Sequence, residues 1–263
     1  MASVISFGGG NSGLQGGIFN GPVNTQFHHY APPERLETPP NPSIVIPFSR
    51  DTDFVQRGIL DQIHQKCAVL GSRTALVGLG GVGKSQLAIE YSYRTRDRSP
   101  ETWVFWVHAS NATRFEQSFQ DIADCVKISG RQSPQADIFQ LVHDWLRDDR
   151  KGKWVLILDN VDDAGFLVKV PSADEDGHTN SRGSKKVRPL VEYLPQCQNG
   201  TILITTRTKV AALQLVEDSN LIVVEPMEKL DAVALLEKKL RVQGDSDTDD
   251  KNSNISELAA ALD

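Results

Sequence analysis

The sequence has 263 residues, of which 39% are hydrophobic and 24% are charged, and its formal net charge is −6. These values are ordinary for a soluble globular protein of one or two domains, and the acidic balance argues against a protein that coats nucleic acid or an anionic membrane. No run of 18 apolar residues is present, so we expect no membrane span. Three widely separated cysteines favour free thiols in the cytoplasm.

Residues 1–30 differ from the rest of the chain. Seven glycines lie between Gly8 and Gly21, and no Lys, Arg, Asp or Glu occurs between Ser3 and His29. Because ordering glycine costs much backbone entropy, this composition predicts a disordered tail. Seven of the 13 prolines then lie between Pro22 and Pro47. Proline favours extended backbone, so we interpret 31–47 as a proline-rich linker.

The main domain is expected over 48–243. A helix-like spacing of apolar residues from Phe54 to Cys67 opens it. Continuous apolar runs then predict strands over 74–78, 103–107, 154–158 and 201–205, with a further candidate over 221–225. Amphipathic helices are expected over 84–94, 115–126 and 138–146. Alternation of this kind indicates an α/β fold, with a parallel sheet covered by helices on both faces.

Two polar stretches interrupt this pattern. Residues 172–188 are rich in Gly, Ser and charge, and we expect a surface loop there. Residues 244–254 are acidic and precede a last expected helix at 256–262. We therefore interpret 244–263 as an acidic loop and the start of a truncated helical region.

The strongest motif is GLGGVGKS at 78–85, which fits the phosphate-binding pattern GxxxxGK[ST]. It lies between an apolar strand and an amphipathic helix, the context in which glycines let backbone N–H groups surround phosphates. Lys84 would contact the β- and γ-phosphates, and the Ser85 hydroxyl would bind Mg²⁺. The predicted nucleotide-binding residues are Gly78, Gly80, Gly81, Val82, Gly83, Lys84, Ser85, Gln86 and Arg207.

Asp159 and Arg207 each follow a predicted strand. Asp159 ends the run WVLILD and is the candidate second magnesium anchor beside Ser85, and we assign catalytic roles to Asp159 and Lys84. Arg207 ends TILITTR and is a candidate sensor of the γ-phosphate. Asp162 and Asp163 follow Asp159, and for them helix capping and catalysis remain alternatives.

The motifs GLGGVGKS, LDNVDD and ILITTR together resemble the NB-ARC nucleotide-binding domain of NOD-like receptors, which are signal-transducing P-loop ATPases, and the fungal receptors in particular. The resemblance extends over about 44–242 and includes the segment 47–55, which in that family helps to hold adenine. It implies a P-loop NTPase fold, ADP or ATP with Mg²⁺ as cofactors, a homo-oligomer in the active state and a role in innate immunity.

Three departures from that family stand out. Asn160 replaces the second aspartate of the plant motif LDDVW, and an amide accepts no proton, so we expect slow hydrolysis unless Asp162 or Asp163 substitutes. The GLPLA-like motif, the winged-helix region and the C-terminal repeats are absent from the sequence. We therefore expect a truncated gene model or a short paralogue.

The tail 1–30 is also similar in composition to amyloid signalling motifs that precede this domain in fungal receptors. Such a motif would engage a separate effector protein, and a plain linker remains the alternative. For the whole chain, a nucleotide switch is the leading hypothesis. A small-molecule kinase and an interaction module with a vestigial nucleotide site are the alternatives.

Overall fold

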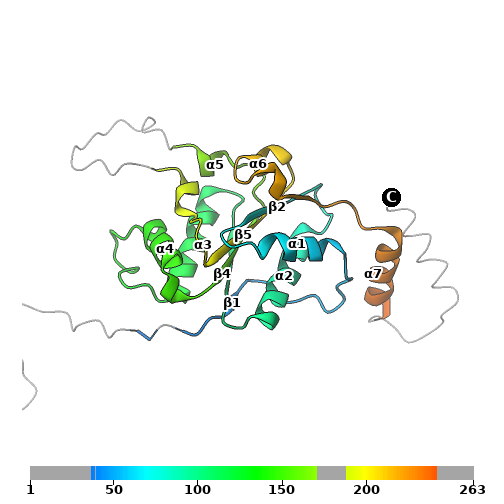
Figure 1. The fold of residues 1–263 in the computed structure, drawn as a ribbon, viewed down its shortest axis with the longest axis horizontal. Coiled ribbons are helices and arrows are strands. Elements are labelled where there is room, and N and C mark those ends of the chain that lie inside the picture. Colours follow the sequence, from blue (N-terminus) through cyan, green and yellow to red (C-terminus); the bar gives the residue numbers. More distant parts are fainter. Residues whose placement is uncertain (1–36, 39, 171–187, 242–263) are drawn as a thin grey trace, which may run out of the picture. The chain divides into compact units, whose positions relative to one another are not determined.

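The computed structural model describes residues 37–38, 40–170 and 188–241 (Figure 1). The chain divides into two units, Met1–Glu37 and Thr38–Asp263, and all of the elements below belong to the second. The predicted tail at 1–30, the linker residues 31–36 and 39, almost all of the loop at 172–188 and the region 244–263 lie outside the described residues.

Six strands form one parallel sheet in the order β1-β3-β4-β5-β2-β6. Their bounds are β1 Ile44–Val45, β2 Arg73–Val77, β3 Trp103–His108, β4 Trp154–Asp159, β5 Gly200–Thr206 and β6 Leu221–Val223. The five predicted strands are confirmed with small shifts at their ends. The strand β1 was not predicted, because its two residues lie in a proline-rich stretch and pair only with β3.

The helices are α1 Ile59–Cys67, α2 Lys84–Arg98, α3 Ala112–Cys125, α4 Ile138–Arg147, α5 Gly165–Val168, α6 Lys209–Leu213 and α7 Lys229–Arg241. In the described ranges, three short 3₁₀ turns accompany them: η1 Asp149–Lys151, η2 Leu190–Tyr193 and η3 Asp218–Asn220. Side-chain caps fix two helix starts, where Asn111 accepts from Arg114 N and Asp137 from Gln140 N. None of the helices in the described part of the chain is long and apolar enough to cross a bilayer.

Helices cover both faces of the sheet, as the sequence predicted (Figure 1). Alternate strand residues point to opposite faces, so neighbours such as Phe105 and Trp106 belong to different cores. On one face α1 and α2 pack against Leu76 and Ile157. On the other, α3 and α4 bury Phe119 and Leu146 against the sheet. The result is a three-layer α/β/α arrangement with two separate apolar cores.

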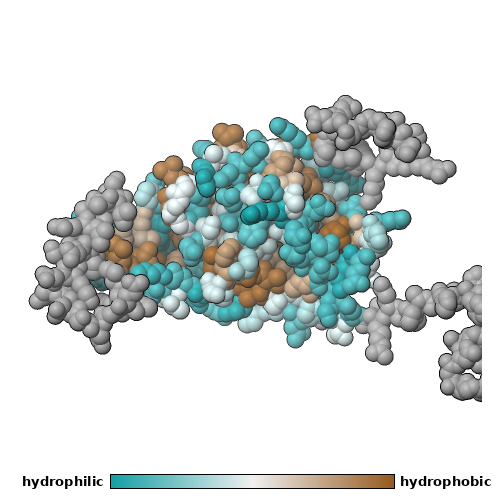
Figure 2. Space-filling view, turned by 180° about the vertical axis from the view of Figure 1, so that it is seen from behind, coloured by the Kyte–Doolittle hydropathy of each residue, from teal (hydrophilic) through white to brown (hydrophobic). Residues whose placement is uncertain are grey.

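The surface of the described residues is largely hydrophilic on the face seen from behind, with hydrophobic areas interspersed (Figure 2). The most exposed large apolar side chains include Leu79 at 72% and Leu230 at 82%. Leu79 belongs to the phosphate-binding motif, so one of these exposed side chains lies at the carboxyl edge of the sheet.

Candidate functional site

The glycine-rich loop connects β2 to α2 at the carboxyl edge of the sheet. Gly78 lies so close to the chain leaving β6 that a Cβ there would stand 2.3 Å from the Val224 carbonyl oxygen. Gly81 and Gly83 have φ angles of +86° and +93°, in the left-handed region that favours glycine. Gly83 is also the N-cap of α2. The glycines of the motif therefore meet specific steric demands of this loop.

Lys84, the first residue of α2, points back into that loop. Its Nζ donates to the carbonyl oxygens of Gly78 and Leu79, both at 2.7 Å, and the residue is only 8% exposed. Burial lowers the pKa of the ammonium; Asp162 and Asp159 oppose that shift, whereas Arg207 adds to it. The loop thus encloses a buried positive charge at the N-terminus of a helix, which is the arrangement that binds phosphate.

Asp159 is the acceptor of two hydroxyl groups. Ser85 Oγ and Thr205 Oγ1 both donate to Asp159 Oδ1 at 2.7 Å, and the carboxylate is almost fully buried at 8% exposure. Hydroxyl and carboxylate oxygens are the ligands that Mg²⁺ prefers. A pair of them beside a phosphate-binding loop fits that ion, because the phosphates and water supply its other ligands.

The loop after β4 carries the two remaining acidic residues. Asn160 adopts a left-handed φ of +65° and donates its N–H to Thr205 Oγ1 at 2.9 Å. Asp162 then accepts from the backbone N of Arg207 at 2.9 Å, and its Oδ2 lies 3.1 Å from Arg207 Nε. Asp163 accepts instead from the backbone N of Gly165, the first residue of α5, at 2.7 Å. The two aspartates therefore have different partners.

An apolar cavity of about 330 Å³ adjoins the loop. Three segments form its walls: the stretch before α1, the glycine-rich loop with the start of α2, and the chain from the end of β6 into α7. The lining residues are Asp51, Phe54, Val55, Arg57, Gly81, Val82, Gly83, Gln86, Leu87, Pro226, Met227 and Leu235. A cavity of this size and polarity is suited to a flat heterocycle.

Arg57 joins the three walls of this cavity. Its guanidinium donates to the Val82 carbonyl at 3.1 Å and to the Glu225 carbonyl at 2.8 Å. Helix α7 is also fastened to the first wall, because Lys239 Nζ lies 2.9 Å from carboxylate oxygens of both Asp51 and Asp53. The cavity walls are thus linked by polar contacts around an apolar interior.

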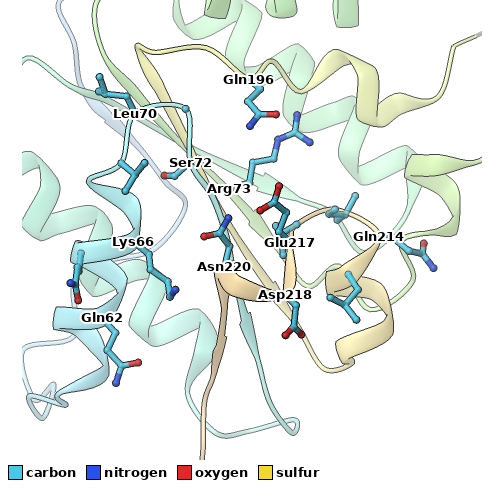
Figure 3. Close-up of a pocket in the computed structure, with 16 residues that line it drawn as sticks. Gln62, Lys66, Leu70, Ser72, Arg73, Gln196, Gln214, Glu217, Asp218 and Asn220 are labelled. Carbon is cyan, nitrogen blue, oxygen red and sulfur yellow. The ribbon is translucent and has the colours of Figure 1, made fainter.

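A larger cavity, of about 1080 Å³, lies at the opposite, amino edge of the sheet. Its lining includes Ser72 and Arg73 at the start of β2, with Lys66 of α1 and Asp218 of η3 facing the same space (Figure 3). No residue that the sequence analysis assigned to the site lines it. Volume alone therefore does not mark the functional end of this domain.

All the predicted site residues come together at the carboxyl edge. The loop residues and Gln86 line or form the phosphate loop and the adjoining cavity, and Asp159 and Arg207 lie across from them. The residues that the sequence did not predict for this site include Thr205, Arg57, Met227 and Leu235. Thr205 lies in the same TILITTR run as Arg207, so its position in that run could have identified it. No motif near Arg57 or Met227 in the sequence indicates a role for either residue.

The comparisons with known proteins agree with this geometry. No family model matches the chain. A nucleotide-binding leucine-rich repeat (NLR)-like protein of Hyaloscypha variabilis is 35% identical over 207 residues, or 76% of this chain, and the chain spans 20% of the length of that relative. Among solved structures, Cdc6p from Pyrobaculum aerophilum superimposes with a TM-score of 0.53 at 15% identity, over 76% of this chain and 53% of that one.

The structural likeness concerns the fold alone, and the sequence likeness concerns the NLR-like protein. The parallel sheet, the glycine-rich loop and its lysine are those of a P-loop NTPase. The chain therefore has the fold of a P-loop NTPase, and over 76% of its length its sequence is similar to that of an NLR-like protein.

Proposed function

We propose that this domain is a nucleotide switch that binds ADP or ATP with Mg²⁺. The observation that carries the proposal is the buried Lys84 ammonium inside the glycine-rich loop, with the Ser85–Asp159 pair and an apolar cavity both next to that loop. A charged site for phosphates beside an apolar site for a base matches the two halves of a nucleotide.

Each group has a role that its contacts support. Lys84 and the loop N–H groups bind phosphate oxygens, and Ser85 and Asp159 hold the magnesium ion. Phe54, Val55 and Leu235 provide apolar contacts to the base. Arg207, at the end of β5, is the sensor for the terminal phosphate.

Hydrolysis is slow in this proposal. Asn160 provides no carboxylate, and the two aspartates that could replace it are engaged, Asp162 with Arg207 and Asp163 with Gly165 N. A general base contributes about 10²–10⁴-fold to a rate, so a site without one keeps bound ATP as the triphosphate for long periods. A long-lived triphosphate state suits a switch.

Signalling by assembly belongs to the same proposal. The relative's name places a nucleotide-binding module in a leucine-rich repeat protein, and such a module transmits a signal when nucleotide exchange changes its contacts. We propose that ATP-bound copies form a homo-oligomer in the cytoplasm and that residues 1–30 engage an effector protein. A peptide of residues 1–30 that stays monomeric when seeded would contradict the effector role.

Nucleotide retention tests the central proposal. The protein is purified without added nucleotide and denatured, and the released nucleotide is quantified by chromatography. We expect about one ADP per chain and an ATP turnover well below the ~1–1000 s⁻¹ of ordinary enzymes. An empty protein that also fails to bind ADP would identify an interaction module, whereas rapid turnover with an acceptor molecule would identify a kinase.

A single substitution tests the reason for slow turnover. Asn160→Asp restores a carboxylate at the position after Asp159, and we expect ATP turnover to rise at least about tenfold. Asp163→Asn is the matched control, because it changes a charge in the same loop at a residue that contacts Gly165. An unchanged rate in Asn160→Asp would show that a missing base does not limit hydrolysis.

A further inference from the structure

The contact between Asp162 and Arg207 joins the loops that follow β4 and β5. The carboxylate binds one residue twice, through Oδ1 to the backbone N of Arg207 at 2.9 Å and through Oδ2 to its Nε at 3.1 Å. The Arg207 side chain is 60% exposed, and a long exposed side chain samples many rotamers unless something holds it. Asp162 is the carboxylate that holds it.

The held guanidinium lies over the phosphate loop. A Cβ placed on Gly80 would stand 3.6 Å from Arg207 Cζ and 3.8 Å from its Nη1, so the end of this side chain lies within van der Waals reach of the loop backbone. Arg207 and Asp162 both also influence the pKa of the Lys84 ammonium, in opposite directions. The charges of the pair therefore act on the phosphate-binding lysine as well as on each other.

The turn that presents Asp162 is fixed by β5. Asn160 N donates to Thr205 Oγ1 and Val161 N to the Thr205 carbonyl, both at 2.9 Å. The left-handed φ of Asn160 then turns the chain toward Arg207, two residues after Thr205. One strand thus supplies Arg207 and also the anchor for the loop that orients it.

We propose that Asp162 is a positioning residue that holds Arg207 over the phosphate loop and so sets the preference of the site for a nucleoside triphosphate over a diphosphate. This inference rests on the proposed function. A guanidinium bound through Nε keeps four N–H donors on its two Nη atoms, and these remain for the terminal phosphate. Because the side chain is already ordered, triphosphate binding loses less conformational entropy.

A double-mutant cycle tests this role. The affinities for ADP and for an ATP analogue with a non-hydrolysable β–γ bridge are measured with Mg²⁺ by calorimetry, and their ratio isolates the terminal phosphate. Arg207→Gln should lower the preference for the triphosphate about tenfold or more, because it removes charge-assisted hydrogen bonds. Asp162→Ala should lower it about fivefold, with the ADP affinity within twofold. The double variant should match Arg207→Gln alone.

Asp163→Ala is the matched control, since it removes the same charge from the adjacent position, where the carboxylate contacts Gly165 N. We expect its preference for the triphosphate to equal that of the wild type. An equal loss in Asp163→Ala, or a loss from Asp162→Ala that persists in the Arg207→Gln background, would assign the effect to loop charge and overturn the proposal. A gain of triphosphate preference in Asp162→Ala would overturn it too, because the aspartate would then compete with phosphate. A wild type that binds no ADP refutes the proposed function, whereas ADP binding with an unchanged ratio in Asp162→Ala refutes only this inference.

Discussion

A cavity lies at each of the two edges of the sheet, and the smaller cavity is the one next to the predicted phosphate-binding and magnesium-binding groups. At the carboxyl edge, about 330 Å³ of apolar space adjoins the glycine-rich loop, and the polar atoms of Lys84, Ser85 and Asp159 converge beside the same loop. At the amino edge, the cavity of about 1080 Å³ is lined by charged groups that bond to separate places: Lys66 to the Ser219 carbonyl, and Asp218 to Lys209. Convergence of donors and acceptors, and not volume, distinguishes a site.

The difference follows from the topology. In a parallel sheet all strands deliver their carboxyl ends to one edge, and the helices that follow begin there with their positive ends. Here α2 follows β2 onto one face and α3 follows β3 onto the other. The loops between them can therefore surround a ligand. Strands begin at the amino edge, where helix C-terminal ends and connecting turns meet instead.

The largest expected effect is on nucleotide affinity, and it tests directly whether the carboxyl edge and the amino edge differ in function. Lys84→Ala removes a buried ammonium that would form two charge-assisted hydrogen bonds of about 1.5–3 kcal/mol each, so ADP affinity should fall about 1000-fold. Lys66→Ala makes the same change at the larger cavity and should leave the affinity unchanged. Calorimetry with ADP and Mg²⁺ measures both, and equal losses in the two variants would remove the distinction between the edges.

The next largest effect is on the free energy of unfolding, when one glycine at each edge of the sheet is replaced by alanine. Gly78→Ala would place a Cβ 2.3 Å from the Val224 carbonyl oxygen, so the backbone of β2 or β6 must move, and we expect a loss of about 3 kcal/mol of stability. Gly71, at the amino edge, has a φ of +70° and a nearest Cβ neighbour at 3.3 Å. Gly71→Ala should lower the free energy of unfolding by about 1–2 kcal/mol. Urea denaturation of both variants gives the two values, and a smaller loss for Gly78→Ala would contradict the packing argument.

The smallest effect concerns a carboxylate that supports one wall of the base cavity. Glu90 of α2 accepts from Arg50 at 2.8 Å and from Arg94 at 2.7 Å, and it is 4% exposed. Burial alone would raise the pKa of this carboxyl group, but the hydrogen bonds from the two arginines outweigh it and hold the pKa below its usual value of 4.5. Glu90→Gln should therefore cost about 1–2 kcal/mol at pH 7.

The sign of the pH dependence follows from that lowered pKa. The contribution of Glu90 is complete above the unfolded value of 4.5 and is lost as the pH falls through the lower folded value. The stability difference between wild type and Glu90→Gln should then shrink below about pH 4.5. Asp97→Asn is the control: this carboxylate also contacts Arg50, at 2.9 Å, but its side chain is 47% exposed. Asp97→Asn should lower the free energy of unfolding by less than about 0.5 kcal/mol.

Much of the carboxyl edge could be predicted from the sequence, because its parts are local. A glycine-rich loop with Lys84, and Asp159 after four or five apolar residues, are patterns within single segments. The cavity for the base could not be assembled in the same way. Met227 and Leu235 reach it only because the chain after β6 returns to the segment before α1. Phe54 illustrates the conflict: its spacing predicts a helical position, but α1 begins at Ile59, and the ring lines the cavity instead.

The hydrogen bonds of Arg57 have a thermodynamic consequence for the domain. One guanidinium contacts the Val82 carbonyl within the glycine-rich loop and the Glu225 carbonyl in the connection from β6 to α7. The conformation of the loop and the docking of α7 are therefore coupled through a single side chain. Coupling free energy is reciprocal, so any factor by which nucleotide strengthens the docking of α7 is also the factor by which docking of α7 strengthens nucleotide binding.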